Sequence, residues 1–199
     1  LCDLYHTNLD DLMRGSVHIA NVHDTELYDA HLNRHSIAIA AIPTLVLIGV
    51  GLLIMLDASG SPSNLSTVVM FCFIIAATVI GIVAGLGHTE FKRKHAGIDP
   101  RYTADVLDRF GRRFTMMIAI GVGLILVDVV ALIGFSPEHG DIVDLGFTAF
   151  HFDLFMGPFL FVLAIAVYIL VYAGMQKEKY DRSEITYIAK DGAVKAGDP

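Results

Sequence analysis

The chain alternates between long apolar runs and shorter polar segments. The apolar runs cover residues 37–56, 65–87, 114–135 and 147–175, and charge enters them only at Asp128 and Asp153. A helix of about 20 apolar residues rises 1.5 Å per residue and crosses about 30 Å of hydrocarbon. The pattern therefore predicts an all-α integral membrane protein, built as a four-helix transmembrane bundle.

Composition agrees with this class. Of the 199 residues, 54% are apolar, and a soluble domain of this size has no way to bury so many in contiguous blocks. The two cysteines, Cys2 and Cys72, do not form a disulfide framework, since Cys72 lies inside an apolar run. We expect a multi-pass protein of the plasma membrane, with the lipid bilayer as its first partner.

The basic residues are segregated along the chain. All 14 Lys and Arg residues fall before residue 36, between residues 88 and 113, or after residue 175. The connections after the first and third spans have none. Because basic residues near a span are retained on the cytoplasmic side, the sequence predicts that both termini and the central segment are cytoplasmic (N-in/C-in). Half of the cations lie in that central segment: Lys92, Arg93, Lys94, Arg101, Arg109, Arg112 and Arg113.

Part of the central segment has an amphipathic pattern. Asp99-Pro100 is a typical helix start, and apolar residues then recur on one face while arginines occupy the other. Such a pattern predicts a short helix in the headgroup region, between spans 2 and 3. The expected membrane-interface residues are Lys92, Arg93, Lys94, Arg109, Arg112 and Arg113.

Residues 1–15 carry a helical pattern of their own. Their apolar residues recur at three- and four-residue spacing, Asn8 is a suitable N-cap and Gly15 a suitable stop. The series Leu1, Leu4, Tyr5, Leu9, Asp10, Asp11, Leu12, Met13, Arg14 and Gly15 resembles the C-terminal end of the Cro/C1-type (XRE family) helix-turn-helix domain. The alternative is an ordinary amphipathic juxtamembrane helix.

The resemblance implies a membrane-anchored transcriptional regulator. Its recognition helix would precede Leu1, so DNA would be bound only through that missing N-terminal domain, and by a dimer. The chain begins without an initiator Met, which favours a fragment. We expect this chain to be the membrane and sensor domain: residues 1–15 end the truncated helix-turn-helix domain, 16–35 form a polar juxtamembrane linker helix, 36–175 form the membrane domain, and 176–199 form a cytoplasmic tail.

Candidate chemistry is confined to a few polar side chains. The sequence has no nucleotide loop, zinc-protease motif, nucleophile elbow or CxxC pair, so we expect neither an enzyme nor a cofactor. In the linker, His31 and His35 have the i,i+4 spacing that lets two histidines share a metal. Scattered surface histidines are the simpler interpretation.

A second polar group lies toward the external side. A carboxylate in hydrocarbon costs several kcal/mol and needs a partner, so we predict that Asp128 pairs with a polar group of span 4. The predicted ligand- or proton-sensing residues are Asp128, His139, His151 and Asp153, and the candidate metal ligands are His139, Asp141 and His151. The alternative is a structural, hydrogen-bonded Asp128 beside ordinary acidic loop residues.

Two functions remain open from the sequence. One is the transcriptional regulator with a membrane sensor domain, and the other is a small four-span transporter or permease-like protein with Asp128 on the substrate path. Small residues at Ala77, Gly81 and Gly85 let another helix approach span 2 closely. We expect this stripe to pack within the bundle, with a homodimer seam as the alternative.

Overall fold

The computed structural model describes residues 22–94, 102–136, 142–144, 149–180, 187–188 and 194–195. The expectations for residues 1–15 and for the first part of the linker lie outside this range. The structure has four long helices: α3 (Val22–Ala58), α4 (Ser63–Lys94), α5 (Ala104–Gly134) and α6 (Phe152–Lys179). Each is long and apolar enough to cross a membrane, which confirms the prediction of four long apolar helices.

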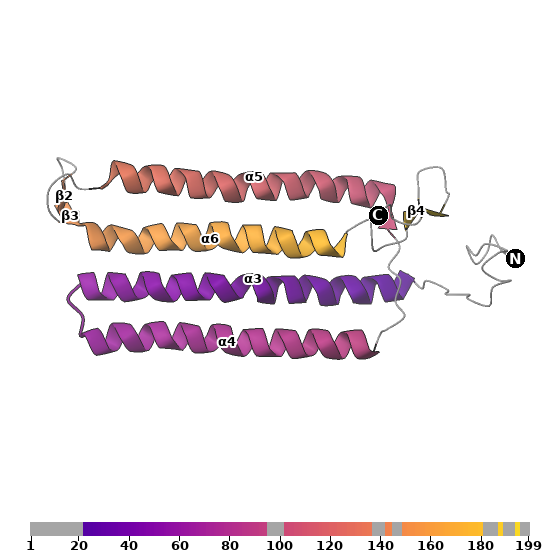
Figure 1. The fold of residues 1–199 in the computed structure, drawn as a ribbon, viewed down its shortest axis with the longest axis horizontal. Coiled ribbons are helices and arrows are strands. Elements are labelled where there is room, and N and C mark those ends of the chain that lie inside the picture. The colour runs from indigo at the N-terminus through magenta and orange to yellow at the C-terminus, as the bar shows by residue number, and fades with distance from the viewer. Residues whose placement is uncertain are drawn as a thin grey trace, which may run out of the picture.

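The four-helix bundle is open. Its helices lie side by side in one row, in the order α5, α6, α3, α4 (Figure 1). Each helix is antiparallel to its neighbour, and α4 and α5 form the two edges. Their outer faces carry many exposed apolar side chains, including Val68, Ile75 and Ile82 on α4 and Leu126 and Val130 on α5. In a bilayer such faces need no further cover, because lipid tails are as apolar as leucine.

Small residues hold the two central helices together. A Cβ on Gly51 of α3 would lie 3.3 Å from the backbone oxygen of Gly157, and a Cβ on Gly157 of α6 would overlap the side chain of Met55. Each glycine therefore lets the other backbone approach. On the same interface Ala40 of α3 and Ala164 of α6 are fully buried, and Thr44 Oγ1 of α3 lies 3.5 Å from the carbonyl oxygen of Ala164.

The predicted stripe on span 2 packs against α3 over part of its length. Ala77 is buried, and a Cβ on Gly81 would lie 3.3 Å from Ile42. A Cβ on Gly85 would meet no atom within 4 Å. Packing within the bundle is thus confirmed for Ala77 and Gly81.

The helices run beyond the predicted spans. The described part of the linker, from Val22 onward, is continuous with span 1 in α3. The predicted interface helix is not a separate element, because residues 104–113 are the first turns of α5. Its apolar face packs on protein: Leu107 is buried, and the ring centroids of Phe110 and Tyr180 are 4.4 Å apart.

Short strands lie at both ends of the row (Figure 1). β2 (Ile142–Asp144) and β3 (Ala149–His151) pair as an antiparallel hairpin, so α6 begins at Phe152, later than the predicted span. At the other end β1 (Tyr102–Thr103), β4 (Tyr187–Ile188) and β5 (Val194–Lys195) form a sheet in the order β1-β4-β5. The tail also begins later than predicted, because α6 continues to Lys179.

Candidate functional site

Three histidines meet where the start of α3 lies beside the end of α4. His31 and His35 are one turn apart and therefore share a face of α3. The antiparallel helix α4 places His88 against them. The ring centroids of His35 and His88 are 4.3 Å apart with an interplanar angle of 13°, and those of His31 and His88 are 5.7 Å apart. We call these residues the histidine cluster.

Phe91 of α4 completes the stack. Its ring centroid lies 3.8 Å from that of His31, with the two planes only 6° apart. Parallel rings point their nitrogens along parallel planes, so the imidazoles do not converge on one point. Among the described residues, no group of three or more His, Cys, Asp or Glu side chains is placed to hold a metal ion. A metal shared by His31 and His35 thus finds no third ligand there.

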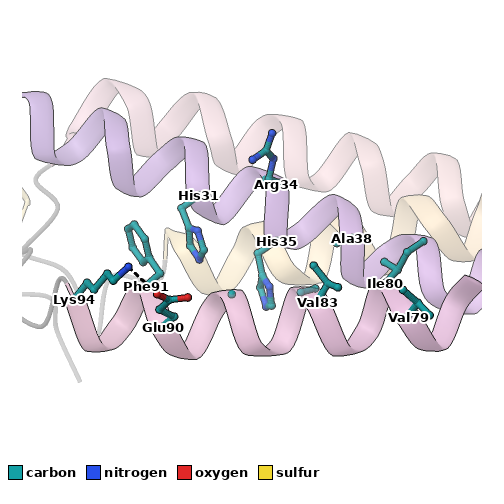
Figure 2. Close-up of a pocket in the computed structure, with 12 residues that line it drawn as sticks. His31, Arg34, His35, Ala38, Val79, Ile80, Val83, Glu90, Phe91 and Lys94 are labelled. Carbon is teal, nitrogen blue, oxygen red and sulfur yellow. Dashed lines mark ion pairs between the residues drawn. The ribbon is translucent and has the colours of Figure 1, made fainter.

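The cluster borders a cavity of about 600 Å³ between α3 and α4. Figure 2 shows His31 and His35 pointing from α3 toward α4, with Phe91 beside an ion pair between Glu90 and Lys94. The two charged atoms of that pair are 2.6 Å apart. The Nδ1 atom of His35 is buried and has no hydrogen-bond partner among the described residues. The remaining wall is mostly apolar, formed by Ala38, Val79, Ile80, Val83, Ala84 and Gly87.

The opposite face of α3 is bound to α6 by polar side chains. Lys179 Nζ lies 2.9 Å from Asp29 Oδ1, and the lysine side chain is only 1% exposed. Asn33 lies one turn after Asp29 on α3, and its Oδ1 accepts a hydrogen bond of 2.9 Å from Gln176 Nε2 of α6. The start of α3 therefore carries histidines on the face toward α4 and ionic or amide partners on the face toward α6.

Asp128 is buried on the side of α5 that faces α6. It lies two helical turns after Gly121, where an added Cβ would be 2.7 Å from Leu170 of α6. The residue is 6% exposed, and its Oδ2 atom has no hydrogen-bond partner among the described residues.

Among the described residues of span 4, no polar group is placed as the partner predicted for Asp128. The rings of Phe135 and Phe155 meet with centroids 4.8 Å apart, which fixes the register of α5 against α6. Asp128 precedes Phe135 by seven residues and is thus about 10 Å deeper in the layer. Asp153 lies near the level of that aromatic contact and is exposed.

The other predicted sensing residues are only partly placed. His151 ends β3, where its backbone pairs with Ile142, and its side chain is outside the described part. His139 and Asp141 also lie outside the described residues, so the external cluster stays a prediction.

The predicted interface cations lie at one end of the row. Lys92, Arg93 and Lys94 end α4, while Arg109, Arg112 and Arg113 lie in the first turns of α5, and all six are exposed. This basic end is also the end that holds the histidine cluster.

Sequence reasoning missed His88. In the sequence it is only the first residue of the central segment 88–113. The available signal was the topology, because counting spans places the end of span 2 beside the start of span 1, level with His31 and His35.

The fold defines a class: four helices long and apolar enough to span a membrane fit a multi-pass α-helical membrane protein. Comparison with family models, with curated proteins and with solved structures found no match to this chain. The resemblance to the XRE family thus rests on residues 1–15 alone.

Proposed function

We propose that this chain is the membrane-embedded sensor domain of a membrane-anchored transcriptional regulator. The observation that supports this is the continuity of α3, which runs unbroken from Val22 to Ala58. One helix thus joins the N-terminal segment to the membrane layer, and the histidine cluster lies at the junction.

The proposal includes an orientation in the plasma membrane. The cations of the basic end lie together, while the connection between α3 and α4 has none, so the positive-inside rule places the basic end in the cytoplasm. After replacement of Cys2 and Cys72, single cysteines at Ser61 and Gly140 should react with an impermeant maleimide added to intact cells. A cysteine at Lys92 should react only after lysis. The reverse pattern would contradict the orientation.

Sensing requires two arrangements that a ligand binds with different affinity. The cavity beside the histidine cluster is a suitable ligand site for this, because its walls belong to two different helices and its shape changes when one of them moves. A ligand there changes how α4 lies against the first turns of α3, which in the sequence follow the segment that resembles the end of a DNA-binding domain.

The class is tested with the natural full-length protein and a promoter reporter. We expect operator binding by a dimer with steep salt dependence, as phosphate contacts require. We also expect His35→Phe, which keeps an aromatic ring against His88, to alter the response of the reporter. A natural chain that has no DNA-binding domain before Leu1 would refute the regulator.

Dimer formation is tested directly at the edge of the row. Cys72 of α4 is exposed beside Phe71 and Ile75, which are also exposed. A parallel pair of α4 edges would allow oxidative cross-linking through Cys72. Cross-linking that vanishes in Cys72→Ser supports the dimer. Monomers alone, measured in bilayers by single-molecule photobleaching, would contradict it.

A small transporter is the second candidate, and the burial of Asp128 favours it. An intramembrane carboxylate commonly marks a proton or substrate path. Purified protein in liposomes should then carry protons across the bilayer, and Asp128→Asn should abolish that flux. Absence of flux in the unmodified protein would leave the regulator as the better explanation.

A further inference from the structure

The cavity between α3 and α4 changes from polar to apolar along its length. Its outer part is bordered by His31, His35 and Lys94, and its inner part by Ile80 and Val83. Because the two helices are antiparallel, both walls change in the same direction (Figure 2). A ligand that fills this cavity therefore has a polar end toward the basic end and an apolar end toward the middle of the layer.

The depth of the polar part matches the headgroup region. The apolar stretch of α3 begins at Ile37, two residues after His35, and α4 has its first charged side chain after the span at Glu90. Lys92 and Arg93 are exposed on the last turn of α4. Juxtamembrane cations of this kind attract anionic lipids.

The charges near the cavity favour an anion. Lys94 borders it, and so does Arg34, whose guanidinium points away from α4 (Figure 2). Glu90 is the one acidic side chain among its lining residues in the described part of the chain. Glu90 is engaged with Lys94 in an exposed ion pair, which an anionic ligand can join. The buried Nδ1 of His35 has no described partner, and a buried polar atom of this kind is normally satisfied by a hydrogen bond.

We propose that this cavity binds an anionic phospholipid from the surrounding leaflet. The phosphate lies beside His35 and Lys94, where charge-assisted hydrogen bonds are available, and an acyl chain lies along Ile80 and Val83. The cavity of about 600 Å³ is within the range of about 300–1,000 Å³ that is usual for small-molecule sites. The inference rests on the proposed function in that it names the chemical class of the sensed ligand.

The test uses the full chain purified in detergent and returned to lipid nanodiscs. Discs of phosphatidylcholine are compared with discs that also contain phosphatidylglycerol. Native mass spectrometry counts the retained lipids, and thermal unfolding measures protection. We expect retained phosphatidylglycerol and a raised unfolding temperature. Inorganic phosphate added to phosphatidylcholine discs is the second arm, and protection by phosphate equal to that by phosphatidylglycerol would replace the lipid with a free phosphate.

Two variants on α4 separate charge recognition from folding. Lys94→Gln should weaken phosphatidylglycerol binding about tenfold, the effect of losing one charge-assisted hydrogen bond. Glu90→Gln breaks the same ion pair but removes the anion, so binding should be unchanged or stronger. Equal weakening by both variants would mean that the ion pair matters only for the helix, and would overturn the proposal.

Two further variants complete the design. His35→Phe preserves the stacking on His88 and should lower lipid binding without lowering the unfolding temperature in phosphatidylcholine. Arg93→Gln removes a neighbouring exposed cation outside the cavity and should leave binding nearly unchanged. Equal retention of both lipids by the unmodified protein would refute the lipid site. A bound lipid with no reporter response would instead refute sensing and leave the site intact.

Discussion

The ion pair between α3 and α6 provides a sharp test of the packing described above. Lys179 and Asp29 approach to 2.9 Å, but they differ in exposure: the lysine side chain is 1% exposed and the aspartate side chain 32%. Removing one partner therefore has a different consequence on each side. Asp29→Ala leaves a buried ammonium group without its carboxylate, whereas Lys179→Met leaves a carboxylate that water can still reach.

The expected magnitudes follow from that asymmetry. Breaking a buried pair costs about 3–5 kcal/mol, and we expect the lower value, about 3 kcal/mol, for Asp29→Ala. The ring of Tyr180 lies 4.7 Å from Lys179 Nζ and offsets part of the loss. For Lys179→Met we expect about 1 kcal/mol, as for a pair that is largely solvated. The double variant should be no less stable than Asp29→Ala alone.

The assay is unfolding of the purified protein in mild detergent by added dodecyl sulfate, followed by circular dichroism. Gln176→Leu is the matched control, because it removes a neutral hydrogen bond one turn away and should cost about 1 kcal/mol. A loss for Lys179→Met equal to or greater than that for Asp29→Ala would show that the lysine reaches water, and would refute the buried geometry.

Two further predictions use the same titration. Gly157→Leu should destabilise the protein by about 1–3 kcal/mol, since the new side chain would collide with Met55. Gly174→Leu on the same helix should change stability by no more than about 0.5 kcal/mol. Equal effects of the two substitutions would contradict the close approach of α3 and α6. Asp128→Leu should stabilise the protein by about 2–3 kcal/mol, because it removes a carboxylate from hydrocarbon. Its reporter output should fall and its proton flux should be lost, as for Asp128→Asn. A destabilised Asp128→Leu would indicate a hydrogen-bonded structural role.

The helices could be predicted because each is encoded by a long, continuous apolar run in the sequence. Apolar length alone gave four spans, and the distribution of cations predicted that the ends of α4, α5 and α6 lie together. The prediction of a separate interface helix was wrong, since these residues are the first turns of α5. Sequence patterning identifies an amphipathic face but not what covers it. On this face the ring of Phe110 contacts the ring of Tyr180, which directly follows α6. The hairpin β2–β3 was missed because strands of three residues carry too little periodicity.

The candidate site was harder to predict because it depends on contacts between helices. His31 and His35 were visible as an i,i+4 pair, but His88 is far away in sequence and became relevant only through antiparallel packing. The register between α5 and α6 likewise separates Asp128 from Asp153, and no local pattern specifies that register. The packing of distant segments therefore places the candidate site at the basic end, where the histidine cluster lies.

The two faces of α3 determine which helix a ligand moves. Asp29 and Asn33 fix α3 to α6, whereas the outer face of α4 packs on no other described helix. Moving α4 breaks only its packing on α3, whereas moving α3 breaks its packing on both α4 and α6. We therefore expect a ligand in the cavity to displace α4 while α3 stays on α6. Spin labels at the exposed Glu26 and Arg93 should then change their separation when phosphatidylglycerol is added. A pair at Glu26 and Lys177 should not, and movement of that pair alone would refute the assignment of α4 as the mobile helix.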